Sequence, residues 1–307
     1  MTPALPTFAF AKAASYDDAL TVLFGTNTTA AGHAATTGGD AAQQRQAADR
    51  PWSAPAIRLR EEQSRSLSED LSDGDDLFDL GDIELSGDAN QQILAVKAAF
   101  RCILASNKIP VCLGGDHLVK YGCIDAVAEV AKRPFGVIYL DAHPDCQRAP
   151  ELQYDTILHH AFSNGLLDPT LCRLVGLREC TLTEAEGLRH YGCPVIRGGE
   201  FASEGAGALA DRVLADFASV EAIYVSIDPD AFNPSDVGAV KQSCASGPLI
   251  DQVLAVLRRV IARKTLLGFD ISEHVPRLDS DGRTSSAMGR LIKKLVVAAR
   301  STPRMAS

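Results

Sequence analysis

The sequence predicts an α/β fold of three layers, in which helices cover both faces of a mainly parallel, doubly wound sheet. From about residue 90 onward, short apolar segments that end in Gly or Asp alternate with longer segments of helical periodicity. Apolar segments such as GVIYL show no polar alternation, so we expect them to be buried on both faces. Because 46% of the 307 residues are hydrophobic, the chain can form one large core, and we expect a single domain over 1–307.

Strands and helices are expected to alternate, as the crossover connections of a parallel sheet require. The strands are expected at 109–113, 136–140, 171–176, 222–227 and 266–271. The helices are expected at about 90–106, 118–132, 207–218, 249–263 and 285–299.

The part of the chain before residue 90 has a different character. Residues 27–56 are rich in Ala, Thr, Gly and Gln, and this composition predicts a mobile surface loop. The acidic segment 66–88 is interpreted as a solvated face, since charge runs usually are. Within it, LFDLGDIEL favours a short strand.

Composition excludes several classes of partner. The formal net charge of −9 argues against nucleic acid and anionic membranes, and it suits a small cationic substrate.

The eight cysteines form no CxxC pair, so reduced thiols are expected. The N-terminus has no basic segment followed by an apolar one, and no apolar run approaches the roughly 18 residues of a spanning helix. A soluble, cytoplasmic protein is expected.

Three polar motifs directly follow predicted strands. GGDH (114–117) follows the first strand, DAHPD (141–145) the second and SIDPD (226–230) the fourth. In open α/β sheets, ligands bind outside the carboxyl ends of the strands. Three segments that are distant in sequence are therefore expected to meet in one place.

The residue types in these motifs predict a metal centre. If the strand continues into DAHPD, Asp141, His143 and Asp145 alternate and project to one side. With His117, Asp228 and Asp230, the cluster would contain four carboxylates and two imidazoles. Such carboxylates repel one another unless protons or divalent cations neutralise them. Any single residue here would more often be a capping group or a hydrogen-bonded core residue than a ligand, but the group predicts metal.

The donor types narrow the choice of ion. Carboxylate and imidazole without thiolate suit Mn, Fe or Zn, and the carboxylate majority favours Mn. Two ions about 3.5–4 Å apart would lower the pKa of a shared water toward neutrality and make it a nucleophile.

GGDH, DAHPD and SIDPDAFNP resemble the three metal motifs of the ureohydrolase superfamily, which includes arginase, agmatinase and formimidoylglutamase. The match spans about 89–297, with a weaker match at APAIR (54–58). The resemblance implies an arginase-like fold, two Mn²⁺ per subunit and a homo-oligomer, either trimer or hexamer. It assigns one ion to His117, Asp141, Asp145 and Asp228, and the other to Asp141, His143, Asp228 and Asp230. It also implies that Asp141 and Asp228 bridge the ions and that Asp145 orients the nucleophile.

Two further residues match the family's catalytic pattern. His160 in HHAFSNG corresponds to a proton shuttle to the leaving amine, a role that suits the pKa of His, although adjacent His159 leaves the register open. Glu273 in DISEHVP corresponds to a glutamate that binds the guanidinium through parallel hydrogen bonds. The alternatives are a surface helix residue for His160 and a capping or surface residue for Glu273.

Several segments depart from the family pattern. Asn233 stands where an Asp is usual, and the altered loop 235–248 is expected to border the pocket. Gln147 and Arg148 stand where arginase carries residues for the amino-acid end of its substrate, so classical arginase activity is disfavoured. Both are candidates for substrate binding, but Arg148 is equally compatible with a solvated surface charge.

The expected activity is hydrolysis of a C–N bond in a linear guanidino or amidino compound, releasing urea and an amine. The expected substrates are those of an agmatinase or a guanidino-acid hydrolase. A formimidoylglutamase that releases formamide is the alternative within the superfamily. A noncatalytic subunit that retains the fold is a second alternative. Phosphoester or amide hydrolysis at another two-metal site is a third, which the lack of a Gly-Lys-Ser/Thr loop disfavours.

Overall fold

One parallel sheet forms the centre of the molecule. The computed structural model describes residues 13, 15–26, 77–83, 85 and 88–301. Within them, eight strands form a sheet in the order β2-β1-β3-β8-β7-β4-β5-β6, and every neighbouring pair is parallel. The strands are β1 (Thr21–Thr26), β2 (Leu77–Ile83), β3 (Ile109–Leu113), β4 (Gly136–Leu140), β5 (Cys172–Leu177), β6 (Val195–Arg197), β7 (Ala222–Ile227) and β8 (Thr265–Ile271).

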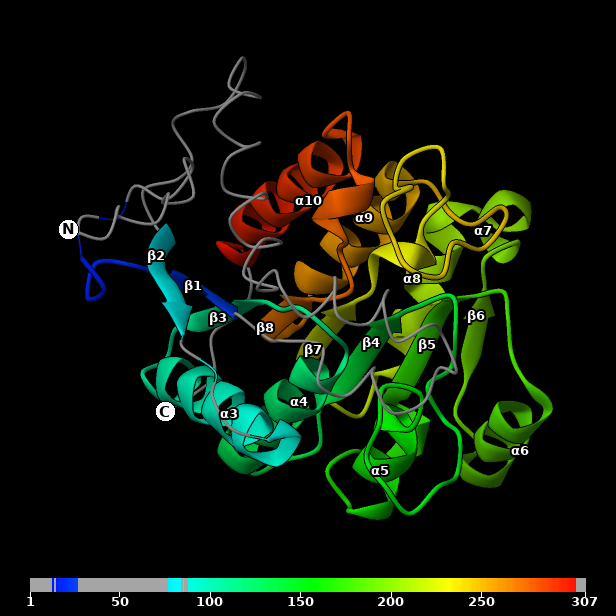
Figure 1. Cartoon of the computed structure of the whole chain (residues 1–307), viewed down its shortest axis with the longest axis horizontal. Helices are drawn as coiled ribbons and strands as arrows, with labels where there is room; N and C mark the ends of the chain where they lie inside the picture. The colour runs from blue at the N-terminus through cyan, green and yellow to red at the C-terminus, as the bar shows by residue number, and fades with distance from the viewer. Residues whose placement is uncertain (1–12, 14, 27–76, 84, 86–87, 302–307) are drawn as a thin grey trace, which may run out of the picture.

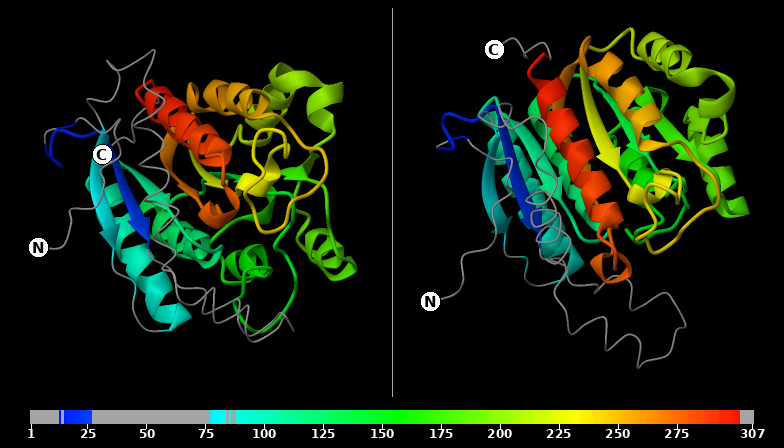
Figure 2. Two further views of the ribbon diagram at one scale, coloured as in Figure 1. Left: turned by 45° about the horizontal axis from the view of Figure 1, so that its top comes forward. Right: turned by 90° about the horizontal axis from the view of Figure 1, so that it is seen from above.

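Helices cover both faces of this sheet. Figures 1 and 2 show α9 and α10 on one side and α3 and α4 on the other. Each face has its own buried apolar cluster, one including α8, α9 and α10 and the other α3, α4 and α5. This confirms the three-layer α/β/α architecture. The helices are α3 (Ala89–Ala105), α4 (Leu118–Ala131), α5 (Ile157–Ser163), α6 (Leu182–Tyr191), α7 (Glu200–Ser203), α8 (Gly205–Asp216), α9 (Ile250–Ile261) and α10 (Arg283–Ala299).

The predicted elements agree with the structure to within two residues at each boundary. The strand expected in LFDLGDIEL is confirmed as β2. Sequence reasoning missed β1, β6, α5, α6 and α7, of which four are seven residues or shorter and offer little periodicity. The expected loop at 27–56, the APAIR segment and most of the acidic segment lie outside the described residues.

The described residues agree with two further expectations. All eight cysteines are free thiols. Among the described helices, none is both long enough and apolar enough to cross a membrane.

A close approach between α6 and the loop after β4 links the fold to the candidate site. A Cβ at Gly187 would lie 1.9 Å from the carbonyl oxygen of Cys146, the residue after Asp145. We expect Gly187→Ala to lower the free energy of unfolding by about 1–3 kcal/mol, because backbone rather than a flexible side chain must move. Gly207→Ala in α8, where a Cβ meets nothing within 4 Å, is the matched control. Chemical denaturation measures both, and equal midpoints for the two variants would contradict the packing argument.

Candidate metal centre and substrate cavity

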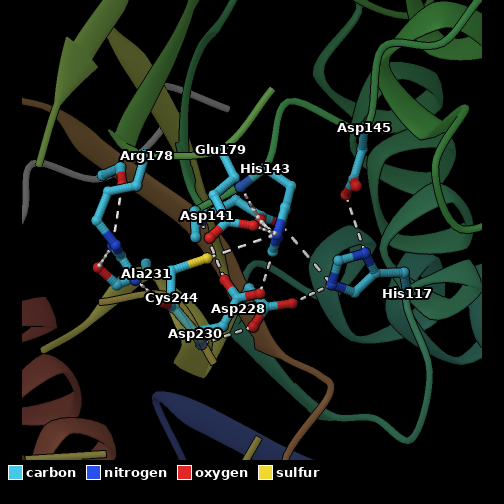
Figure 3. Close-up of polar contacts among 12 residues, drawn as sticks. His117, Asp141, His143, Asp145, Arg178, Glu179, Asp228, Asp230, Ala231 and Cys244 are labelled. Atoms are coloured by element: carbon cyan, nitrogen blue, oxygen red, sulfur yellow. Dashed lines mark hydrogen bonds and ion pairs between the residues drawn. The ribbon is translucent and has the colours of Figure 1, made fainter. Parts of the chain in front are cut away.

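Functional side chains gather at one edge of the sheet because β3, β8, β7 and β4 are neighbours and parallel. GGDH follows β3, Glu273 follows β8, SIDPD spans the end of β7, and DAHPD follows β4. Figure 3 shows the side chains of the cluster pointing toward one another. The structure thus brings together the six predicted ligands His117, Asp141, His143, Asp145, Asp228 and Asp230.

The DAHPD segment is a turn, so the expected continuation of the strand through it is wrong. β4 ends at Leu140. The backbone N–H of His143 donates to Asp141 Oδ1 at 2.8 Å, and Asp145 has a left-handed backbone with φ of 45°. The backbone oxygen of Asp145 accepts from Leu158 N at 2.9 Å, which ties this strained residue to α5. A hydrogen-bonded turn, rather than strand alternation, makes these side chains converge.

The half of the cluster around His143 fits a divalent cation. Donor atoms of Asp141, His143 and Asp230 lie within 4.8 Å of one another. His143 Nδ1 lies 3.0 Å from Asp230 Oδ2 and 3.6 Å from Asp141 Oδ1. Burial, with the nearby Asp228 and Asp141 carboxylates, raises the pKa of Asp230 well above its ordinary value. The Asp230 carboxylate is therefore short of positive charge, which a divalent ion would supply.

The other ring nitrogen of His143 faces a thiol. Cys244 Sγ lies 3.6 Å from His143 Nε2, and Glu179 Oε2 lies 3.9 Å from the same nitrogen. Burial raises the pKa of Cys244 to about 11, so the thiol remains protonated near neutral pH. We interpret Cys244 as a residue that helps to orient the His143 ring.

The half of the cluster around His117 already contains a cationic side chain. His117 Nδ1 lies 2.9 Å from Asp145 Oδ2, and its Nε2 contacts Asp228 Oδ2. Lys120, in α4, is fully buried, and its Nζ lies 3.1 Å from Asp141 Oδ2. Burial lowers the pKa of Lys120, but the Asp141, Asp228 and Asp145 carboxylates outweigh burial and raise it above its ordinary value. Donor atoms of His117, Asp141 and Asp145 also lie within 4.8 Å of one another, but here the Lys120 ammonium would compete with a metal ion for them.

Sequence reasoning missed Lys120, although a signal was present. Lys120 is a single lysine in the otherwise apolar start of α4, where Leu118, Val119, Gly122 and Cys123 are also buried. It also follows His117 by three residues, and residues three apart lie on the same face of a helix. A charged residue at that position must find its counter-charges near His117.

Glu273 is held in a conformation that an L-residue rarely adopts. Its φ is 58°, its N–H donates to Gly115 O at 2.7 Å, and its Oε1 accepts from His117 N at 3.0 Å. The residue is 8% exposed, and burial raises the pKa of its carboxyl to about 7. A carboxylate in this position is costly to ionise until a cation faces it. It therefore suits recognition of a guanidinium.

A cavity of about 600 Å³ opens over the cluster. The loop 235–248 contributes to its lining, and Asn233 holds that loop by accepting from Ser235 N at 2.9 Å and donating to Gly247 O at 3.3 Å. Its lining includes His117, His143, Asp145, Tyr154, Asp228, Asp230, Lys241 and Glu273.

The remaining predicted residues occupy different places. Gln147 lines the cavity, whereas Arg148 is exposed and does not. His160 lies half-buried on α5 and does not line the cavity; its Nε2 has no hydrogen-bond partner among the described residues. His159 does not line it either, and its Nδ1 lies 2.7 Å from the hydroxyl of Tyr191. The roles of Arg148 and His160 stay predictions.

Comparison with known proteins identifies relatives. The model of the arginase family matches residues 44–298. Proclavaminate amidinohydrolase of Streptomyces clavuligerus is 31% identical over 213 residues, which cover 67% of each chain. Formimidoylglutamase of Halobacterium salinarum is 30% identical over 230 residues, which cover 72% of each chain.

Solved structures show the same fold. The structure of proclavaminate amidinohydrolase from Streptomyces clavuligerus has a TM-score of 0.79 at 25% identity, with coverage of 96% of this chain and 97% of that one. Agmatine ureohydrolase of Thermoplasma volcanium has a TM-score of 0.76 at 23% identity, with coverage of 97% and 95%. By sequence and by fold, the chain belongs to the arginase family and is a hydrolase of C–N bonds other than peptide bonds.

Proposed function

We propose that this chain hydrolyses a guanidino acid, releasing urea and an amino acid, and that it uses manganese to do so. One observation carries the proposal: the cavity over the carboxylate cluster presents a buried carboxylate, Glu273, and an ammonium, Lys241. The two groups interact electrostatically. A linear substrate with a guanidinium at one end and a carboxylate at the other would satisfy both.

Glu273 is proposed to bind the guanidinium. Its Oε1 accepts from the backbone N–H of His117, and this contact places the carboxylate beside the cluster. A bound guanidinium carbon would therefore face the candidate ligands. Parallel hydrogen bonds from a planar cation to a carboxylate hold it in one orientation. A divalent ion bound by the cluster would supply a nucleophile from water at neutral pH.

Lys241 is proposed to bind the far end of the substrate. It belongs to the loop 235–248, and its Nζ lies 5.8 Å from the centre of the Tyr154 ring. Burial lowers the pKa of Lys241, while the nearby Glu273 carboxylate opposes this shift. A substrate carboxylate beside Lys241 would provide a further counter-charge. The names proclavaminate amidinohydrolase and formimidoylglutamase also refer to carboxylic acids, which supports this choice.

A substrate panel tests the proposal. The manganese-loaded chain is assayed for urea with 4-guanidinobutyrate, arginine, agmatine and guanidine, and for formamide with formimidoylglutamate. We expect urea release, with a guanidino acid giving the highest kcat/KM. Preference for agmatine would contradict the proposed role of Lys241, and lack of urea from every guanidino compound would contradict the activity. Formamide without urea would instead support the formimidoylglutamase alternative, which the same Lys241 also suits.

Removing the Lys241 charge should weaken binding of the acid end alone. We expect Lys241→Met to raise KM for 4-guanidinobutyrate by about 10- to 100-fold, the loss expected for a hydrogen bond between charged groups. The kcat should change little, since the contact is equal in the ground and transition states. KM for agmatine, which has no carboxylate, should not rise. Lys294→Met in α10, outside the cavity lining, is the matched control. An equal rise of KM for 4-guanidinobutyrate and for agmatine in Lys241→Met would contradict the assignment.

A further inference from the structure

The Lys120 ammonium lies inside the candidate metal cluster, with no exposed surface. Its Nζ is 3.1 Å from Asp141 Oδ2, 3.2 Å from His117 Nε2 and 3.9 Å from Asp228 Oδ2. These three residues are among the four that the family resemblance assigns to one of the two metal ions. The ammonium thus contacts the donor atoms that this ion would need.

Neighbouring groups hold the lysine in place. Its Nζ lies 4.6 Å from the centre of the Tyr139 ring, a cation–π contact in a site that excludes water. The Tyr139 hydroxyl donates to Asp145 Oδ2 at 2.6 Å, and His117 Nδ1 lies 2.9 Å from the same oxygen. Protein groups therefore already contact one oxygen, Oδ2, of the Asp145 carboxylate, the fourth residue of that metal position.

The two halves of the cluster differ in positive charge. The described residues give the carboxylate of Asp230 no lysine or arginine partner, and its ion-pair contact is with His143. Arg178 lies nearby but donates to backbone oxygens, including that of Ala231 at 2.7 Å. Lysine thus contacts His117 and the two shared residues Asp141 and Asp228, whereas His143 and Asp230, which belong to the other metal position alone, have no such contact among the described residues.

We propose that the Lys120 ammonium replaces one of the two metal ions of the family pattern, so that this chain binds a single divalent ion through Asp141, His143, Asp228 and Asp230. A second ion in the His117 half would share oxygen atoms with a buried positive charge, and like charges at such separations repel strongly in an interior. Lys120 is a positioning residue in this arrangement. It neutralises the Oδ2 side of Asp141 and Asp228 and leaves their Oδ1 atoms, which accept from the backbone N–H groups of His143 and Asp230, for the remaining ion.

Counting bound metal in the full chain tests this inference. The purified chain is stripped with a chelator, reloaded with Mn²⁺, separated from free ion and analysed by elemental analysis and by EPR. We expect about one Mn²⁺ per chain, with the spectrum of an isolated ion, since a single carboxylate-rich position remains. We expect Lys120→Ala, which removes the charge and opens space, to bind about two ions with a spin-coupled spectrum. Two coupled ions in the wild-type chain, or none, would overturn the inference.

Further variants test whether Lys120→Ala folds and which residues bind the single ion. Lys97→Met removes a lysine that pairs with Asp125 and Glu129 outside the cluster, and should leave the count unchanged. If Lys120→Ala does not fold, Lys120→Ser offers a hydroxyl to Asp141 and should gain the second ion. A folded variant that gains none contradicts the role of Lys120. Asp230→Asn should lose the single ion and His117→Ala should keep it, and the reverse result would overturn the assigned position.

The inference rests on the ligand assignment of the proposed function but not on its substrate. Metal is counted without substrate, so two ions would overturn the inference and leave the guanidino-acid activity standing. One ion per chain without urea release would support the inference and contradict the guanidino-acid activity.

Discussion

Asp228→Asn should abolish both metal retention and urea release. Asp228 is 1% exposed, lines the cavity and touches both halves of the cluster, since it contacts His117 and its Oδ1 accepts from Asp230 N at 2.7 Å. The amide retains the shape but removes the charge that an ion requires. We expect kcat/KM to fall by about 1,000-fold or more, equivalent to about 4 kcal/mol of transition-state stabilisation. Steady-state urea assays and elemental analysis of the same sample measure the two losses.

The Tm of the metal-free protein distinguishes the loss of a metal ligand from unfolding of the variant. In the metal-free cluster the other carboxylates repel Asp228, but it pairs with His117 and Lys120, so stripped Asp228→Asn should still unfold cooperatively, with a Tm no higher than that of the stripped wild type. Asp211→Asn is the matched control, because Asp211 is exposed and pairs with Arg259 on the surface. It should retain metal and activity. Activity of Asp228→Asn within tenfold of the wild type would show that Asp228 is not a ligand.

Glu273→Gln should leave the metal in place and remove substrate recognition. The amide oxygen of Gln can still accept from His117 N, so the left-handed turn after β8 should persist. What is lost is the charge that faces the guanidinium, and charge-assisted paired hydrogen bonds are about twice as strong as neutral ones. We expect kcat/KM to fall by about 100-fold or more, a loss of about 3 kcal/mol.

The measurement combines kinetics with metal content. Unchanged manganese with reduced kcat/KM is the expected pattern, and loss of manganese would instead make Glu273 part of the metal centre. Glu221→Gln, at an exposed surface pair with Arg133, is the control and should behave as the wild type. Wild-type kcat/KM in Glu273→Gln would exclude the guanidinium-binding role.

The sheet and the candidate ligands were predictable because their signals are local. Apolar segments such as 109–113 and 136–140 correspond to β3 and β4 without a change of boundary, since strands buried on both faces need continuous apolar sequence. His and Asp residues directly after such strands must lie at the carboxyl edge of a parallel sheet. The short elements β6 and α7 were missed because three or four residues carry no usable periodicity.

The turn at DAHPD shows where local reasoning fails. Alternation along a strand predicted that Asp141, His143 and Asp145 share one side, and they do converge, but for another reason. The left-handed conformation of Asp145 depends on a contact with Leu158, thirteen positions further along the chain. Since L-residues adopt this conformation at a cost, only surrounding structure can maintain it.

By itself, the sequence determined the architecture and the chemical type of the site, because burial and residue identity at strand ends are properties of short segments. The tertiary structure decided how charge is distributed there. Lys120 reaches Asp141 across 21 positions of sequence. Lys241 enters the cavity from the loop 235–248, which was expected to border the pocket, but no sequence pattern singled out this lysine. Electrostatic interactions depend on distance in space and on exclusion of water, and neither can be derived from local sequence. The count of metal ions and the choice of substrate therefore depend on the folded chain.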